Sequence, residues 1–251
     1  MPVILVSKGL AYGFGCMFMV LTACSKSRPV ANASEPLPPP PVVVNPPTVQ
    51  PDSLAYLALG DSYTIGQSVS PMDRFPVLTT DLLKQKGFKI KAPDIIARTG
   101  WSTYDLLYEL TQYPVPNSYQ LVTLLIGVNN QFRRIPLENY ETEFRQLLTY
   151  SVNRAGGNPK RVIVLSIPDY SVTPFARSSN RTQIAAEIDL FNERNRAITN
   201  SAGISYINIT DLSREAAKDP ALLTNDSLHY SRKYYAQVAE KITALAVDKL
   251  Q

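Results

Sequence analysis

Residues 54–66, Leu-Ala-Tyr-Leu-Ala-Leu-Gly-Asp-Ser-Tyr-Thr-Ile-Gly, join an apolar run to an abrupt polar stop at Gly60-Asp61-Ser62. Six mostly apolar residues bounded by glycine are typical of a buried strand in a parallel sheet. The polar triplet then lies at the carboxyl end of that strand, the edge where open α/β sheets bind ligands. Ser62 would present its hydroxyl there, as a nucleophile requires. Asp61 or Ser62 could equally cap the next helix, since both residue types favour that position.

Four more apolar segments have the length of strands, and segments with helical periodicity separate them. The expected strands cover 89–97, 119–126, 161–167 and 204–209. The expected helices cover 72–86, 136–154, 182–202 and 231–250, with another running from Ser102 or Thr103 toward Pro114. Strands alternating with helices predict an α/β fold with a parallel sheet covered on both faces. The segment 119–126 is the most apolar, so we expect it at the centre of the sheet.

Composition excludes several classes of function. The net charge is only +4, and the 25 lysines and arginines are scattered along the 251 residues, so the sequence gives no indication of nucleic-acid binding. His229 is the only histidine, which excludes a site with several imidazole ligands. Neither G-x-G-x-x-G nor a Walker pattern occurs. We therefore expect no metal and no organic cofactor.

The first 52 residues have the pattern of an export signal followed by a spacer. Lys8 precedes a largely apolar run over 9–20, as in a secretory signal peptide. The sequence Leu21-Thr22-Ala23-Cys24 then resembles a bacterial lipobox, in which Cys24 is acylated and becomes the first residue of the mature chain. An ordinary signal peptide with a chance cysteine is the alternative. Residues 24–52 are rich in proline and favour an extended polyproline II spacer, with a disordered leader as the alternative.

These features predict three parts: a signal peptide over 1–23, a lipidated cysteine with its linker over 24–52, and a folded domain over 53–251. The domain would be anchored in a bacterial cell envelope through lipid on Cys24 and would face the periplasm or the cell surface. Ser25, where some lipoproteins have aspartate, favours the outer membrane.

The segment Asp226-Ser227-Leu228-His229 stands just before the last expected helix. Serine needs a base to remove its proton, and a histidine base needs a carboxylate to orient it and to stabilise the imidazolium. Ser62, Asp226 and His229 supply these three parts. Taken by itself, His229 could instead be a surface or helix-capping residue.

Hydrolysis through a serine also needs donors for the oxyanion of the tetrahedral intermediate. Gly100 and Asn129 each follow an expected strand. The N–H of a glycine can approach a substrate closely, and the asparagine side chain can add a second donor. The alternatives are a tight turn for Gly100 and a helix cap for Asn129.

In this order, Gly60-Asp61-Ser62, Gly100, Gly127-Val128-Asn129 and Asp226-Ser227-Leu228-His229 resemble the four blocks of the SGNH, or GDSL-type, hydrolases. The resemblance implies a flavodoxin-like α/β/α sandwich with strand order 2-1-3-4-5 and ester hydrolysis through an acyl-enzyme. It implies Ser62 as nucleophile, His229 as base and Asp226 as its orienting partner, with Ser62, Gly100 and Asn129 as oxyanion donors. Asn130 departs from the aspartate that often follows Asn129 in the family, which affects the local geometry of that block.

The expected function is therefore a serine esterase acting on an acyl ester with a short acyl chain, such as an O-acetylated saccharide. Trp101, Asn130 and Tyr170 are candidate substrate contacts, and Phe132 and Phe175 could line the same cleft. The alternatives are a lysophospholipase or thioesterase that prefers long acyl chains, and a surface module that binds glycans or other partners without catalysis. The absence of a G-x-S-x-G motif at Ser62 argues against an ordinary α/β-hydrolase.

Overall fold

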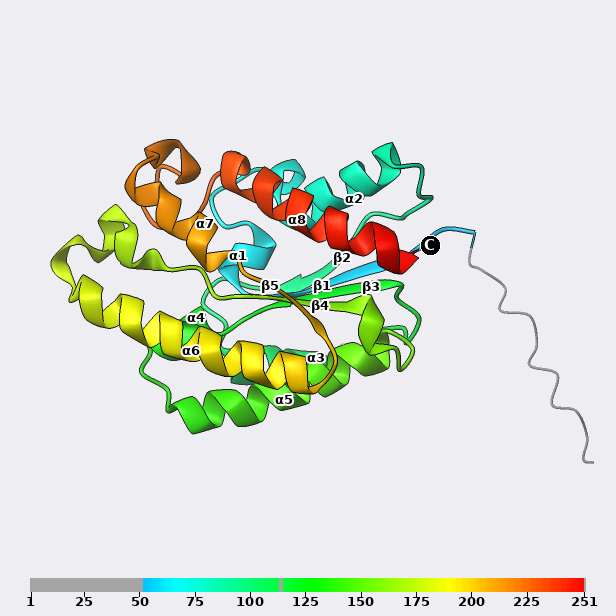
Figure 1. Ribbon diagram of the computed structural model, residues 1–251, viewed down its shortest axis with the longest axis horizontal. Helices are drawn as coiled ribbons and strands as arrows, with labels where there is room; N and C mark the ends of the chain where they lie inside the picture. Colours follow the sequence, from blue (N-terminus) through cyan, green and yellow to red (C-terminus); the bar gives the residue numbers. More distant parts are fainter. Residues whose placement is uncertain (1–51, 113–114, 251) are drawn as a thin grey trace, which may run out of the picture. The chain divides into compact units, whose positions relative to one another are not determined.

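Five parallel strands form one sheet in the order β2-β1-β3-β4-β5, which confirms the predicted fold class and strand order. The computed structural model describes residues 52–112 and 115–250, shown in Figure 1. The predictions for the signal peptide, Cys24 and the proline-rich linker lie outside the described residues. The strands are β1 (Tyr56–Gly60), β2 (Asp94–Ala97), β3 (Leu121–Leu125), β4 (Val162–Leu165) and β5 (Ser205–Ile207).

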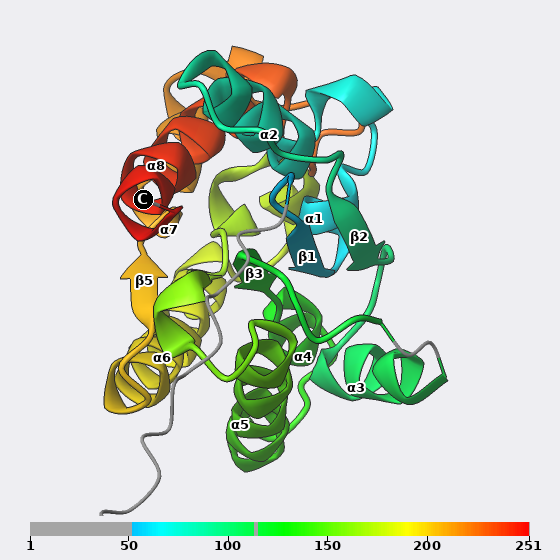
Figure 2. The ribbon, with the colours of Figure 1, turned by 90° about the vertical axis from the view of Figure 1, so that its right-hand side faces the viewer.

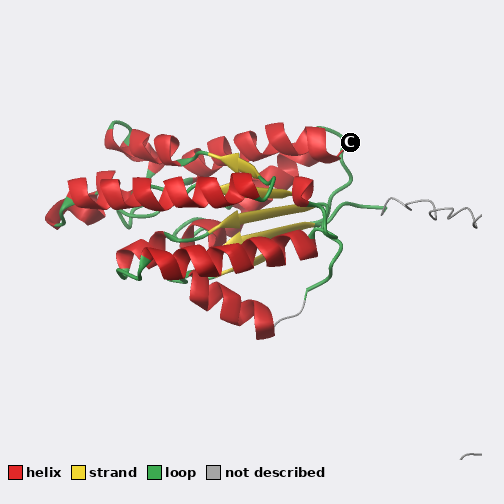
Figure 3. Cartoon of the chain, turned by 60° about the horizontal axis from the view of Figure 1, so that its bottom comes forward, coloured by secondary structure: helices red, strands yellow, loops and turns green. Residues whose placement is uncertain are grey.

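Helices cover both faces of the sheet. Helices α2 (Phe75–Gln85) and α8 (Arg232–Leu250) lie on one face, and α3 (Thr103–Gln112), α5 (Leu137–Arg154) and α6 (Arg181–Ser201) lie on the other (Figures 1 and 2). Figure 3 shows the strands between these two helical layers. The handedness of the crossovers separates α2 from α3, α5 and α6, because α2 connects β1 to β2, a step that runs across the sheet in the opposite direction to the later steps.

The core lies on the two faces of the central strands. Every residue of β1 and of β3 is buried, as their continuous apolar sequences predict. Thr123 is the one polar residue in β3, and its hydroxyl is hydrogen-bonded to the Tyr56 hydroxyl at 2.9 Å. Strand β2 is at the edge of the sheet and is only partly buried.

The observed strands are shorter than expected, and the two largest differences concern the strand expected over 89–97 and the helix expected over 72–86. The strand expected over 89–97 contains Pro93, which has no N–H to donate, and regular pairing begins only at Asp94. The helix expected over 72–86 begins at Phe75, because Pro71–Asp73 form a separate 3-10 turn. The short helix α1 (Ser62–Ile65) is the one that Asp61 or Ser62 was expected to cap, whereas α4 (Val128–Phe132) and α7 (Thr210–Arg214) were not predicted.

Two glycines allow the backbone to pack closely at the carboxyl ends of β1 and β3. A Cβ on Gly60 would lie 2.3 Å from the carbonyl oxygen of Leu125, so only glycine fits there. Gly127 has φ +131°, and a Cβ on it would meet Tyr140 at 2.6 Å. The chain segments that follow these strands are thereby held side by side. In residues 52–112 and 115–250, no helix has both the length and the apolar character needed to cross a bilayer.

Candidate active site

Ser62 is the first residue of α1, directly after β1. Asp61 caps this helix, because its Oδ1 accepts a hydrogen bond from the Tyr63 N–H at 3.0 Å. The capping role thus belongs to Asp61, and Ser62 lines a cavity with only 5% of its surface exposed. The N–H groups in the first turn of a helix have no acceptor within the helix, and the N–H of Ser62 is one of them.

His229 lies on a tight turn that precedes α8. An antiparallel bridge between Leu223 and Tyr230 closes this turn, and Ser227 within it has a left-handed backbone with φ +65°. The His229 side chain is largely buried and meets the ring of Tyr63 edge-on, with 5.7 Å between ring centroids. Because Tyr63 is the neighbour of Ser62, this contact places His229 next to the segment that carries Ser62.

Asp226 accepts hydrogen bonds on both carboxylate oxygens. Its Oδ2 lies 2.7 Å from Nδ1 of His229 and also accepts from the Ser68 hydroxyl. Its Oδ1 accepts from Thr224 Oγ1 at 2.8 Å and from the N–H groups of Leu228 and His229, each at 2.9 Å. Partial burial favours the neutral acid, but these hydrogen bonds outweigh it and hold the pKa of Asp226 well below its usual range.

The ionised state of Asp226 assigns the protons on the His229 ring. An ionised carboxylate can only accept hydrogen bonds, so Nδ1 of His229 carries the proton that it shares with Oδ2. In the neutral ring, Nε2 is then the acceptor, which is the form that a general base requires. Ser62 and His229 line the same cavity without a hydrogen bond between them in this structure.

Gly100 and Asn129 line the same cavity as Ser62 and His229. Gly100 has φ +85°, and its carbonyl accepts from the guanidinium of Arg133, which also pairs with Asp105 at 3.0 Å. The side-chain nitrogen of Asn129 donates to the carbonyl of Trp101 at 2.9 Å. This bond uses one of the two amide hydrogens and leaves the second for a substrate oxygen.

The cavity has a volume of about 150 Å³ and brings together the predicted nucleophile, base and oxyanion residues. Its other walls are mainly apolar or aromatic. They are formed by Tyr63, Thr99, Val128, Phe132, Tyr170, Phe175 and Leu228. Of the three candidate substrate contacts, Tyr170 is therefore at the site.

The structure corrects the other two candidate substrate contacts. Asn130 is fully buried outside the cavity, where its Oδ1 accepts from the Thr103 N–H at 3.0 Å and its Nδ2 donates to the Thr103 hydroxyl at 2.6 Å. It therefore fixes the start of α3 and does not face a substrate. Trp101 does not line this cavity; it lines a separate groove beside β2, and its backbone carbonyl accepts a hydrogen bond from Asn129.

Tyr170, Phe132 and Phe175 form a triangle of rings at the cavity mouth, with centroids 6.1 to 6.3 Å apart. Phe132 and Phe175 are 53% and 48% exposed, although both are large apolar side chains. The N–H of Phe175 donates to the carbonyl of Ser227 at 3.1 Å, which ties this wall to the histidine turn. The mouth therefore offers flat apolar surface to a ligand.

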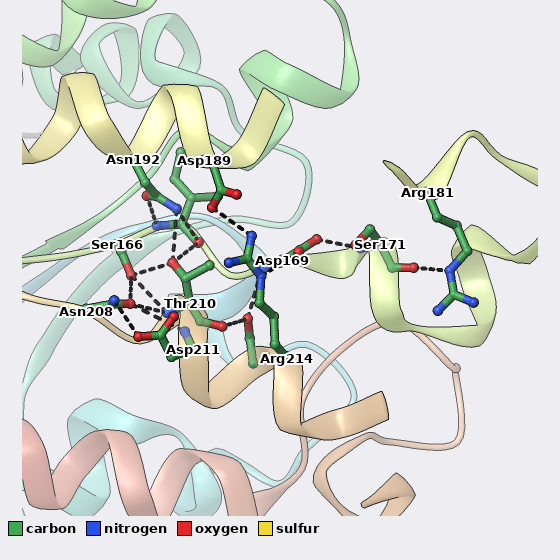
Figure 4. Close-up of polar contacts among 12 residues, drawn as sticks. Ser166, Asp169, Ser171, Arg181, Asp189, Asn192, Asn208, Thr210, Asp211 and Arg214 are labelled. Carbon is green, nitrogen blue, oxygen red and sulfur yellow. Dashed lines mark hydrogen bonds and ion pairs between the residues drawn. The ribbon is translucent and has the colours of Figure 1, made fainter. Parts of the chain in front are cut away.

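A polar network holds the loop that carries Tyr170 (Figure 4). Arg214 bridges Asp169 at 2.9 Å and Asp189 at 2.7 Å, and the Asp169 side chain is almost completely buried. In the same network, the hydroxyls of Thr210 and Ser166 lie 2.8 Å apart and join α7 to the end of β4. The loop after β4 is thereby anchored to α6 and α7, on which Asp189, Thr210 and Arg214 lie (Figure 4).

Several residues at the site carried no signal in the sequence. Ser68 and Arg133 hold Asp226 and the Gly100 loop through contacts between distant segments, and nothing in their sequence neighbourhoods marks them. The described residues include no group of three or more His, Cys, Asp or Glu side chains placed to hold a metal ion.

Comparison with known proteins assigns the family. Residues 58–237 match the model of the GDSL-like lipase/acylhydrolase family, while a search of curated sequences gave no significant match. Among solved structures, the chain is similar to the acetyl xylan esterase AlAXEase, with a TM-score of 0.61 at 16% identity, covering 76% of this chain and 98% of that one.

Two further structures show the same likeness in fold. The lipase/acylhydrolase from Enterococcus faecalis has a TM-score of 0.59 at 20% identity, with 76% and 96% of the two chains covered. The acetylxylan esterase Axe2 from Geobacillus stearothermophilus has a TM-score of 0.59 at 16% identity, with 77% and 94% covered. With these blocks in order on this fold, the chain belongs to the GDSL-like lipase/acylhydrolase family and is a hydrolase of the SGNH type.

Proposed function

We propose that this hydrolase is a serine esterase that cleaves short-chain acyl esters through an acyl-enzyme on Ser62. The observation that carries the proposal is the one cavity that Ser62, Gly100, Asn129 and His229 line together. Asp226 is hydrogen-bonded to Nδ1 of His229, which leaves Nε2 as the atom that can act as base. A nucleophile, an oriented base and two kinds of oxyanion donor around one cavity are what acyl transfer requires.

The reaction begins when Ser62 Oγ attacks the ester carbonyl and His229 Nε2 takes the serine proton. The N–H groups of Ser62 and Gly100 and the free amide hydrogen of Asn129 stabilise the resulting oxyanion. When the tetrahedral intermediate collapses, His229 returns the proton to the departing alcohol and the acyl group stays on Ser62. His229 then deprotonates a water molecule, which attacks the acyl-enzyme. When this second tetrahedral intermediate collapses, the acid leaves and His229 returns the proton to Ser62 Oγ.

Asp226 serves this cycle by remaining ionised. Its carboxylate keeps the proton of the neutral ring on Nδ1 and stabilises the imidazolium that forms during each attack. The hydrogen bond between Ser62 and His229 would form when substrate closes the site, since such bonds are often absent without substrate.

The size of the cavity supports a short acyl group. A dry cavity of about 150 Å³ holds a molecule the size of benzene, which corresponds to about six carbon atoms. The cavity described above has that volume and a mainly apolar wall. The exposed rings of Phe132 and Phe175 at the mouth suit a flat carrier such as a sugar ring, and two of the similar structures are acetylxylan esterases. We therefore propose an O-acetylated saccharide as the substrate class.

We further propose that lipid on Cys24 anchors the protein in a bacterial envelope, most directly the outer membrane, with the domain in the periplasm or at the surface. The lipobox-like Leu21-Thr22-Ala23-Cys24 and the following Ser25 support this. Mass spectrometry of the mature amino terminus should find a diacylglyceryl group on Cys24, and Cys24→Ala should move the protein to the soluble fraction. An unmodified terminus would contradict the anchor.

Hydrolysis of p-nitrophenyl acetate, butyrate, octanoate and palmitate tests the function. Acetate and butyrate should be the best substrates, and Ser62→Ala and His229→Ala should each lower kcat by about 10⁴-fold or more. Ser70→Ala, which changes an exposed serine in the loop after α1, is the matched control and should keep parental activity. Preference for palmitate would favour a lysophospholipase or thioesterase, and a folded protein with no turnover would favour a binding module.

A further inference from the structure

The loop that follows the proposed nucleophile is tied to the peptide of that residue. The carbonyl of Ser62 accepts hydrogen bonds from the N–H of Gly66 and from the N–H of Gln67, the latter at 2.9 Å. Ser68 is the next residue, so its position is set by the same turn that sets Ser62. Ser68 does not line the cavity and is exposed to solvent.

The Ser68 hydroxyl reaches across to the histidine turn. It donates to Oδ2 of Asp226, the same oxygen that lies 2.7 Å from Nδ1 of His229. Every other donor to Asp226 comes from its own turn: Nδ1 of His229 donates to Oδ2, and the Thr224 hydroxyl and the backbone N–H groups of Leu228 and His229 donate to Oδ1. Ser68 therefore links the carboxylate to the nucleophile segment, 158 residues away in the sequence.

The backbone at both ends of this contact is in the left-handed region. Ser68 has φ +68°, and Ser227, which follows Asp226, has φ +65°. Residues with a Cβ adopt this conformation at a cost in free energy, whereas glycine adopts it freely. What serine offers at position 68, and glycine does not, is the hydroxyl that meets Asp226.

We propose that Ser68 is a positioning residue. It holds the Asp226 carboxylate, and through it the His229 ring, in the position from which His229 can accept the Ser62 proton. The catalytic meaning of this role rests on the function proposed above. Without the hydroxyl, Oδ2 of Asp226 would keep His229 as its partner but lose its link to the nucleophile turn. The His229 ring would then spend less time in the orientation that accepts the serine proton.

Two substitutions separate the effect of the Ser68 hydroxyl from the effect of the left-handed backbone conformation. Ser68→Ala removes the hydroxyl and keeps a Cβ in the left-handed conformation, whereas Ser68→Gly removes the hydroxyl and relieves the conformation. Both should lower kcat for p-nitrophenyl acetate by about tenfold, the range expected for a hydrogen bond to a charged group. KM should stay within twofold of the parent, because Ser68 does not line the cavity. Ser70→Ala is the control.

A second readout does not depend on turnover. His229 is the only histidine, so the proton shared between its Nδ1 and Asp226 gives the single low-field imidazole resonance of the protein. This resonance should shift and exchange faster with water in both Ser68 variants, including variants made in a Ser62→Ala background. Failure of the proposed function, seen as a parent without esterase activity, is thereby distinguished from failure of the Ser68 assignment.

Two results would overturn the assignment. One is that both variants keep the parental kcat and the parental low-field resonance. The other is that Ser68→Gly restores the activity that Ser68→Ala loses, because the loss would then arise from the backbone conformation. Ser68→Gly should fold at least as stably as the parent, which circular dichroism and thermal unfolding will check.

Discussion

Asp61 is a buried carboxyl group beside Ser62, the proposed nucleophile, and replacing it with asparagine should stabilise the protein in a pH-dependent way. Only 1% of the residue is exposed. Its Oδ1 accepts from the Tyr63 N–H, and its Oδ2 is buried without a hydrogen-bond partner in the described part of the chain. Asparagine keeps the oxygen that caps α1 and cannot ionise, so the substitution removes a buried charge and little else.

The size of the effect follows from the pKa of Asp61. Burial disfavours the ionised carboxylate and raises its pKa. The hydrogen bonds from the N–H groups of Tyr63 and of Asp61 itself lower the pKa by less, so it rises from 3.8 to about 7. At about 1.4 kcal/mol per pH unit, this interval corresponds to a cost of about 4 kcal/mol for keeping the ionised group folded.

The direction in which the stability changes with pH follows from proton binding to Asp61. Between pH 4 and pH 7 the folded protein holds a proton on Asp61 that the unfolded chain has lost, so the free energy of unfolding falls as the pH rises. The stability that this group contributes is complete below pH 4 and is lost by about pH 7. The Asp61→Asn variant has no carboxyl group to ionise at this position and does not lose this stability. Its free energy of unfolding should therefore exceed that of the parent by near zero at pH 4 and by about 4 kcal/mol at pH 8.

Urea denaturation of parent and Asp61→Asn at pH 4.5, 6, 7 and 8 measures this difference. Asp81→Asn, the same change on the exposed side of α2, is the matched control and should show no such trend. The reasoning is refuted if the free energies of unfolding of Asp61→Asn and parent run parallel across this pH range. It is equally refuted if the variant is less stable than the parent at pH 8.

Four further predictions follow from the same structure. Gly60→Ala should prevent stable folding, measured by circular dichroism, because its Cβ would lie 2.3 Å from the backbone oxygen of Leu125; a folded variant would contradict the close packing. Asn129→Ala should lower kcat for p-nitrophenyl acetate by about 10²- to 10³-fold with little change in KM, and a parental kcat would remove Asn129 from the oxyanion site. Arg214→Leu should lower the free energy of unfolding by about 2 to 3 kcal/mol in urea titrations, since it leaves the buried Asp169 carboxylate without its cation, and an unchanged midpoint would show that the ion pair adds nothing. Incubation with EDTA should leave esterase turnover unchanged, and a loss that zinc reverses would show a metal requirement.

The fold could be predicted well because its signals are local and repeated. Strands β1 and β3 are buried on both faces and therefore have continuous apolar sequences, and the long helices show helical periodicity over several turns. The short helices α1, α4 and α7 have four or five residues each, which is too few for hydrophobic periodicity to reveal them.

Much of the candidate site was also predictable, because parallel strands end at a common edge. Ser62, Gly100 and Asn129 each follow a strand, and the fold brings them to one cavity. The expectation for Asn130 was wrong because of side-chain direction. Asn130 is buried and hydrogen-bonded to Thr103, which spacing along the chain does not reveal.

The contacts that Ser68 and Arg133 make with distant segments could not be predicted. The bond from Ser68 to Asp226 and the bond from Arg133 to Gly100 each join loops whose approach depends on the whole fold. The sequence around each of these residues resembles any polar loop, so only the structure identifies them.

Covalent trapping of the nucleophile tests the central claim most directly. A p-nitrophenyl alkylphosphonate transfers its phosphonyl group to an activated serine, and peptide mass spectrometry then locates the adduct. We predict one adduct per chain, on the peptide that contains Ser62, absent in Ser62→Ala and formed much more slowly in His229→Ala. An adduct on another residue, or an unmodified Ser62 in protein whose esterase activity the phosphonate has abolished, would contradict the assignment of Ser62 as the nucleophile.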